Sequence, residues 1–311
     1  DLTRIYGDSD PALTHTVTGG NLVFGDALSG ALIRAGGENV GVYTISQGTL
    51  SAGSNYTLTF VDGAFTITPR AITVTADDLA RIYGDADPAL THAITSGNLV
   101  FGDTLSGALT RAGGENVGDY AILQGTLSAG SNYTLTFVQG ALSITPRPLT
   151  LTGGSFTRVY GDADPALTYA ITTGNLVFGD TLTGAATRAP GQNVGVYAVQ
   201  QGTLSAGSNY AITFINGALT ITPRAIVVTA NDLSKIFGNA DPALTWAVTG
   251  GNLVFGDTLG GALTRAPGQA VGDYAITQGS LGNANYAITF VNGVFTILPL
   301  ASAPQFSVAE S

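Results

Sequence analysis

The chain has 311 residues, of which 44% are hydrophobic and only 10% are charged, with 43 glycines and 12 prolines. Disordered chains combine low hydrophobicity with high charge, so this composition predicts a folded protein. The net charge of −10 disfavours nucleic acid and anionic membrane surfaces as partners, and the absence of cysteine excludes disulfides and thiolate catalysis.

Four copies of one sequence unit make up most of the chain. The phrase Arg-Ile-Tyr-Gly-Asp at residues 4–8 returns with small changes at intervals of 77 residues. The copies cover residues 1–70, 71–147, 148–224 and 225–300, and residues 301–311 form a tail. This period exceeds the roughly 20 to 45 residues of a solenoid unit and is long enough for a small separate core, so the sequence predicts four modules in tandem.

Alternating apolar and hydroxyl residues predict β-strands in every copy. In the second copy the expected strands cover residues 72–76, 91–95, 108–111, 119–127, 133–138 and 142–145. The last two flank Gln139 and Gly140, a pair typical of a two-residue turn, so a hairpin is expected there. The one expected helical element is a single turn after Asp10. The predicted fold class is therefore all-β.

The joints between copies are short. One proline ends the last strand of each of the first three copies, and an arginine begins the next strand: Arg70, Arg147 and Arg224. Proline fixes φ and cannot donate to a strand ladder, so the chain stays extended there. We expect these arginines to bridge neighbouring modules, the alternative being solvated side chains. Modules of about 35 Å each would then form an elongated rod of about 140 Å.

The first copy and the tail differ from the rest. The first copy lacks a counterpart of strand 72–76, so either the chain was cut from a longer protein or another segment supplies this strand. Residues 305–310 alternate in the same way, which makes Phe306 and Val308 candidates for strand donation to a second copy. Such head-to-tail contact does not close and would build a filament. The alternative is a disordered tail on a fragment.

No catalytic, cofactor or metal site is expected. The two histidines, His15 and His92, occupy a place that holds Tyr169 and Trp246 in the later copies. A general base or metal ligand cannot be exchanged for Tyr or Trp, so this place requires a planar ring. There is also no run of about 18 to 20 apolar residues, so no membrane insertion is expected within the chain. Any export signal or anchor is expected to lie outside this sequence.

The repeated aspartates have two interpretations. Asp85 and Asp87 in a Gly-Asp-x-Asp-Pro run could bind calcium, but Asp87 fits a turn-forming residue better and the other ligands of a helix-loop-helix calcium loop are missing. Asp103 precedes Arg111 by eight residues, which predicts an ion pair within each module. Acidic residues recur in every copy, whereas an active site normally occurs once, so an enzyme is the least expected class.

The repeated signature resembles the MBG repeats of the YGX type over residues 1–300. The second copy carries all of its elements: Tyr83-Gly84, Pro88, Leu90, Asn98, Leu99, Val100, Gly102, Asp103, Val117-Gly118, Tyr120, Asn132-Tyr133, Phe137 and Ile144-Thr145-Pro146. In the fourth copy, Phe237 and Leu298 depart from the pattern. The resemblance implies small β-grasp-like or sandwich modules in bacterial surface or secreted adhesins, including filamentous-haemagglutinin-like and biofilm-matrix proteins. It transfers no catalytic residue.

Three hypotheses for function follow. The leading one is a non-enzymatic structural stalk of an extracellular adhesin that supports cell adhesion or biofilm. The second is a filament subunit that associates head-to-tail through its tail. The third is a multivalent array that binds a cell-surface glycan or protein through repeated weak sites.

Overall fold

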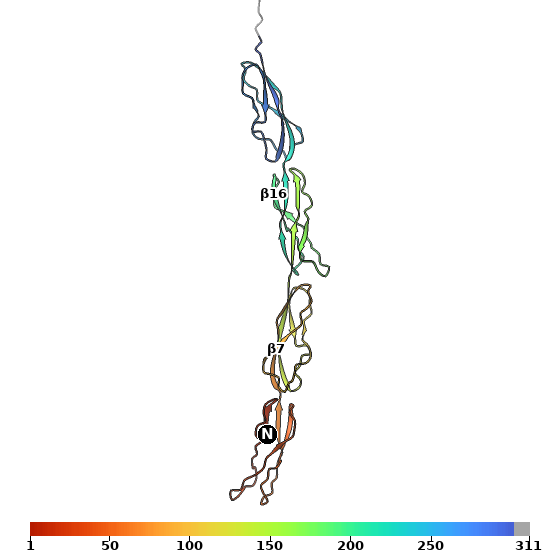
Figure 1. The fold of residues 1–311 in the computed structure, drawn as a ribbon, viewed down its shortest axis with the longest axis vertical. Helices are drawn as coiled ribbons and strands as arrows, with labels where there is room; N and C mark the ends of the chain where they lie inside the picture. Colours follow the sequence, from red (N-terminus) through yellow and green to blue (C-terminus); the bar gives the residue numbers. More distant parts are fainter. Residues whose placement is uncertain (302–311) are drawn as a thin grey trace, which may run out of the picture. The chain divides into compact units, whose positions relative to one another are not determined.

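The computed structural model describes residues 1–301, and the regular elements in this part are 25 β-strands (Figure 1). The chain is an all-β tandem array, as predicted. The helical turn expected after Asp10 is not formed, since residues 10–13 have no regular structure. Within residues 1–301, no helix is long and apolar enough to cross a membrane.

Contacts divide the chain into two compact units. Unit 1 holds Asp1–Arg147 and Ser208–Tyr210, and unit 2 holds Pro148–Gly207 and the described residues from Ala211 onward. Unit 1 therefore contains the first two sequence repeats, and unit 2 contains most of the third and all of the fourth.

The second repeat shows the plan of a complete module, which has two sheets. The three-stranded sheet has the order β10-β5-β7 and the four-stranded sheet has the order β6-β11-β9-β8. The strands are β5 (Arg70–Ala76), β6 (Leu79–Ile82), β7 (His92–Ser96), β8 (Thr110–Arg111), β9 (Gly118–Leu123), β10 (Tyr133–Val138) and β11 (Gly140–Thr145). β5 runs parallel to β10, and β6 runs parallel to β11, so two chain segments pass side by side from one sheet to the other.

The expected hairpin at Gln139 and Gly140 is wrong, because β10 and β11 lie in different sheets and do not pair. Gly140 does not have a positive φ. A Cβ atom there would lie 2.7 Å from the carbonyl oxygens of both Ala76 and Asp77. This glycine is therefore required by the close approach of two backbones where the chain changes sheets, and not by a tight turn.

Later repeats follow the same plan. In repeat 3 the strands are β12 (Arg147–Gly153), β13 (Ser155–Val159), β14 (Tyr169–Thr173), β15 (Thr187–Arg188), β16 (Gly195–Gln200), β17 (Tyr210–Ile215) and β18 (Gly217–Thr222). In repeat 4 they are β19 (Arg224–Ala230), β20 (Leu233–Ile236), β21 (Trp246–Gly250), β22 (Thr264–Arg265), β23 (Gly272–Thr277), β24 (Tyr286–Val291) and β25 (Gly293–Leu298). His92 and its counterparts Tyr169 and Trp246 are the first residues of β7, β14 and β21, and β7 is labelled in Figure 1.

The first repeat has only the four-stranded sheet, in the order β1-β4-β3-β2. Its strands are β1 (Leu2–Ile5), β2 (Ile33–Arg34), β3 (Gly41–Ser46) and β4 (Gly63–Thr68). Residues 15–19 and 56–61, which correspond to β7 and β10, form no strand. Both β7 and β10 pair with β5 in the second repeat, and among the described residues the first repeat has no counterpart of β5.

Candidate functional site: the joint between repeats

The repeated signature residues meet where one repeat follows another. Pro69 is the one residue between β4, the last strand of repeat 1 along the chain, and β5, the first strand of repeat 2. Buried side chains from both repeats form one apolar cluster in which Tyr6 and Ile67 join Ile72 and Tyr133. Neighbouring modules in unit 1 therefore share buried surface instead of being linked only by the backbone.

A strained turn at residues 100–103 forms the part of this joint that belongs to repeat 2. Phe101 and Gly102 have φ values of 56° and 80°, and the amide of Asp103 donates to the carbonyl of Val100 over 2.9 Å. A positive φ is uncommon for a bulky residue and marks a conformation that the surroundings must enforce. The same φ recurs at Phe24, Phe178 and Phe255. The turn directs the Asp103 carboxylate toward the preceding repeat.

Tyr6 of repeat 1 fits against this turn. Its hydroxyl donates to Asp103 over 3.0 Å, and its ring packs edge-on against Phe101 and Tyr133 at centroid distances of 5.4 and 5.5 Å. The next residue, Gly7, must lack a side chain, because a Cβ atom there would lie 2.6 Å from Cγ2 of Val100. The Tyr-Gly pair that marks each repeat thus supplies a ring and leaves room for its neighbour.

Asp103 accepts two tyrosine hydroxyls. Tyr133 of repeat 2 donates to the same oxygen over 2.8 Å and accepts a hydrogen bond from the amide of Val100 over 2.9 Å. Burial, and then the neighbouring carboxylate of Asp103, raise the pKa of Tyr6 above the ordinary tyrosine value of about 10. Burial likewise raises the pKa of Tyr133. Both hydroxyls therefore remain protonated donors at neutral pH.

Arg70, predicted to bridge modules, lies at this joint. Its Nε donates to the carbonyl of Tyr6 over 2.7 Å, and its Nη2 pairs with Asp8. Nη1 donates to the side chain of Asn98 in repeat 2 over 3.3 Å. The guanidinium therefore contacts the Tyr-Gly turn of one repeat and a side chain of the next.

Asn132 adds a second set of bonds. Its carbonyl accepts from the amide of Arg70, and its side-chain oxygen accepts from the amide of Val40, each over 3.0 Å. Its side-chain nitrogen donates to Asn39 over 3.0 Å. One asparagine of repeat 2 thus holds the edge of repeat 1 and the strand that enters repeat 2.

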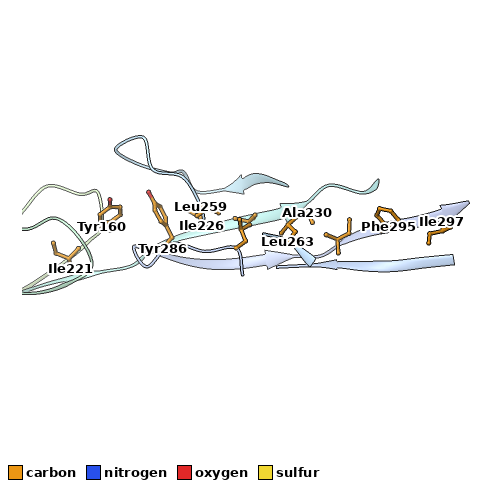
Figure 2. Packing of buried hydrophobic residues seen from close by; sticks show 12 residues of the cluster. Tyr160, Ile221, Ile226, Ala230, Leu259, Leu263, Tyr286, Phe295 and Ile297 are labelled. Carbon is orange, nitrogen blue, oxygen red and sulfur yellow. The ribbon is translucent and has the colours of Figure 1, made fainter. Parts of the chain in front are cut away.

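The same joint recurs in unit 2, between repeats 3 and 4. Tyr160 and Tyr286 both donate to Asp257 over 2.9 Å, and their rings, which lie next to each other in Figure 2, pack edge-on with centroids 5.6 Å apart. Arg224 donates to the carbonyl of Tyr160 over 2.7 Å and pairs with Asp162. Burial, followed by the Asp257 hydrogen bond, raises the pKa of Tyr160. Two joints therefore have equivalent hydrogen bonds.

Within unit 1, Arg147 donates from Nε to the carbonyl of Tyr83 over 2.8 Å and pairs with Asp85. Phe306 and Val308, the candidates for strand donation, lie outside the described residues. At the end of repeat 4, Phe237 has no hydroxyl and Leu300 stands where the other repeats have arginine, and both are exposed.

The expected ion pair between Asp103 and Arg111 is wrong. Arg111 pairs instead with Asp87 over 2.5 Å, while the other carboxylate oxygen of Asp87 lies 2.6 Å from Nε of the buried Arg81. Glu115 pairs with both arginines. The hydrogen bond from Arg111 is the first of the effects that lower the pKa of Asp87. Asp87 is thus the centre of an ion cluster, a role that its turn position did not indicate.

No group of three His, Asp or Glu side chains within residues 1–301 is arranged to hold a metal ion. Asp85 and Asp87, the pair that could have suggested calcium, each pair with arginine. What the arrangement does is structural: it holds adjoining modules against each other through buried rings and charge-assisted hydrogen bonds.

The fold and the joints define a class of tandem all-β repeat protein. The family model for the MBG domain of the YGX type matches residues 1–66, 72–143, 149–220 and 226–296, and the chain belongs to this family. Domains of this family are typical of extracellular and surface proteins. No curated protein matches the chain closely.

Proposed function

We propose that the chain is a non-enzymatic structural repeat region, the stalk of a bacterial extracellular adhesin that supports cell adhesion or biofilm. The observation that carries the proposal is the use of the signature side chains. Tyr6, Arg70, Asp103 and Asn132 serve contact between modules, and their counterparts do the same between repeats 3 and 4. A chain whose signature residues hold its adjoining repeats together is suited to fix the distance between whatever lies at its two ends.

A scattering measurement on the full chain tests this function. We expect a largest dimension on the order of 140 Å, from four modules of strand length. The variant Tyr160→Ser with Arg224→Ala should give a broader distance distribution, because it removes two of the polar links of one joint, the Tyr160 hydroxyl and the Arg224 guanidinium. Identical distributions for the two proteins would argue against a spacing role. Turnover of a substrate or strong binding on a glycan array would indicate another function.

A filament formed by head-to-tail strand donation is a second candidate. It is favoured by the first repeat, where residues 15–19 and 56–61 leave a place for one more strand. Copying the joint itself between chains is less favourable, because Phe237 and Leu300 lack the hydroxyl and the guanidinium that the joint uses. Concentration-dependent growth in light scattering would support the filament, and a constant mass would exclude it.

A further inference from the structure

The first repeat contains an open groove of about 660 Å³. Its two walls are residues 14–19 and 57–61, and its floor is formed by Leu28, Leu32, Ile45 and Leu50. Asp1, Leu2 and Gly63 lie at one end. The groove therefore lies between the two segments that form no strand.

The other repeats show what fills this place. In repeat 2, β5 lies between β10 and β7, parallel to the first and antiparallel to the second. Ile72 and Val74 of β5 belong to one buried cluster with Leu127, and the partly buried Leu105 and Leu109 pack against this cluster. These three leucines are the counterparts, 77 residues later, of Leu28, Leu32 and Leu50 in the groove floor. β12 and β19 occupy the same place in repeats 3 and 4.

We propose that this groove is an acceptor site for a polypeptide strand with the pattern of the opening strands. That pattern is a basic residue first and small or branched apolar residues at the third, fifth and seventh positions, as in Arg70–Ala76, Arg147–Gly153 and Arg224–Ala230. Both walls carry backbone groups that pair with a strand in every other repeat, so the incoming strand would be bonded along both edges.

The register follows from the second repeat. Ile72 and Val74 align with Leu135 and Phe137 of β10, so their equivalents in the bound strand align with Leu58 and Phe60. Ala76 aligns with His92 of β7, so the seventh residue meets His15. The strand runs parallel to residues 57–61, with its carboxyl end at Asp1.

Gly63 independently supports a role of the groove as an acceptor site. A Cβ atom at its counterpart Gly140 would lie 2.7 Å from two carbonyl oxygens of the opening strand and its extension, whereas at Gly63 the nearest atom is 3.7 Å away. Gly63 thus leaves room for the backbone of a bound strand at this place. The joint face next to the groove is also formed, since Tyr56 donates to Asp26 over 2.8 Å while the Phe24 ring is fully exposed.

This acceptor site goes beyond the stalk role, because a chain can set distance whether or not its first groove is filled. The test uses the full chain and a synthetic peptide with the sequence of residues 70–77. In parallel, the same eight residues are joined in front of Asp1, in the register that they have before Asp78. Hydrogen exchange is followed at residues 15–19 and 57–61.

The grafted chain should exchange at these residues at least about ten-fold more slowly than the unmodified chain. The free peptide should produce the same protection in the unmodified chain, and it should add no further protection in the grafted chain, whose groove is already filled. A graft in which the copies of Ile72 and Val74 are aspartate should give no protection. Gly63→Ala should cancel the protection in the grafted chain and leave the unmodified chain unchanged, because only the filled groove brings carbonyl groups close to this residue.

Two results would overturn the proposal. Unchanged exchange in the grafted chain would show that the groove does not accept this strand in the stated register. Protection that grows with chain concentration and is not affected by the peptide would assign the groove to a second copy instead. Neither result bears on the scattering test of the stalk, so the two proposals fail separately.

Discussion

Replacing Asp164 by alanine should destabilise the third repeat by about 3 kcal/mol. Asp164 lies between two arginines, 2.6 Å from Nε of Arg158 and 2.6 Å from Nε of Arg188, whose side chains are only 4% and 10% exposed. In the part of the chain that the structure describes, it is the one carboxylate that pairs with either arginine. Its removal leaves two largely buried charges unpaired. Because Asp164 itself is 36% exposed, water reduces the loss below that of a fully buried pair.

The second repeat supplies a matched control. There Glu115 pairs with both Arg81 and Arg111, whereas Gln192 stands at the equivalent place in the third repeat. Asp87→Ala should therefore cost clearly less than Asp164→Ala, because one carboxylate remains. Hydrogen exchange of β13 and β16, compared with that of β6 and β9, measures each repeat by itself. Equal losses in the two repeats would show that Glu115 does not compensate for the loss of Asp87.

The same comparison has a pH dependence. The Arg188 hydrogen bond is the main effect that lowers the pKa of Asp164. The stability from this group is therefore complete above the unfolded carboxylate value of about 4 and is lost as the pH falls through the lower folded value. Asp164→Ala should remove this part of the acid sensitivity of the third repeat.

Gly140→Ala should destabilise the second repeat by about 1 to 3 kcal/mol, as overpacking does elsewhere. The added Cβ would lie 2.7 Å from the carbonyl oxygens of Ala76 and Asp77, so the two chain segments that change sheets together must separate. The amide of Ala141 also donates to Asp78 over 2.8 Å at this point, and the shift would weaken that bond. Thermal unfolding and hydrogen exchange of β5 and β11 measure the effect.

Gly63→Ala is the control for this prediction. Its Cβ has 3.7 Å of clearance and its φ is not positive, so the change should be neutral or slightly stabilising through the unfolded state. A comparable loss at both glycines would mean that close backbone approach is not the reason for glycine at this position.

The sequence predicted most strands because their inward residues are apolar, but it missed β6. This strand, Leu79–Ile82, has Arg81 as its one buried side chain, so apolar alternation is absent. The strand predicted over residues 119–127 ends already at Leu123, because the chain turns at Gly125, whose φ is 56°. The false hairpin has a comparable origin, since glycine is compatible with both a turn and a close approach of backbones.

The polar contacts show where sequence reasoning ends. Spacing along the chain suggested that Asp103 pairs with Arg111, but the turn at Phe101 directs the carboxylate to Tyr6, 97 residues away. No local pattern signals a contact at that separation. The joint nevertheless left a trace in the sequence, because the asparagine and aspartate recur in every copy and the tyrosine of Tyr6 recurs at Tyr83 and Tyr160.

Signature residues of adjoining repeats should be energetically coupled if they hold the joint together. The direct test is a double-mutant cycle of Tyr160→Phe and Asp257→Ala, read out at Trp246, the single tryptophan, which packs against the core of repeat 4. Because this bond joins a buried hydroxyl to a carboxylate, we expect a coupling of about 1 to 2 kcal/mol in the unfolding of repeat 4. Strictly additive effects of the two changes would contradict the claim.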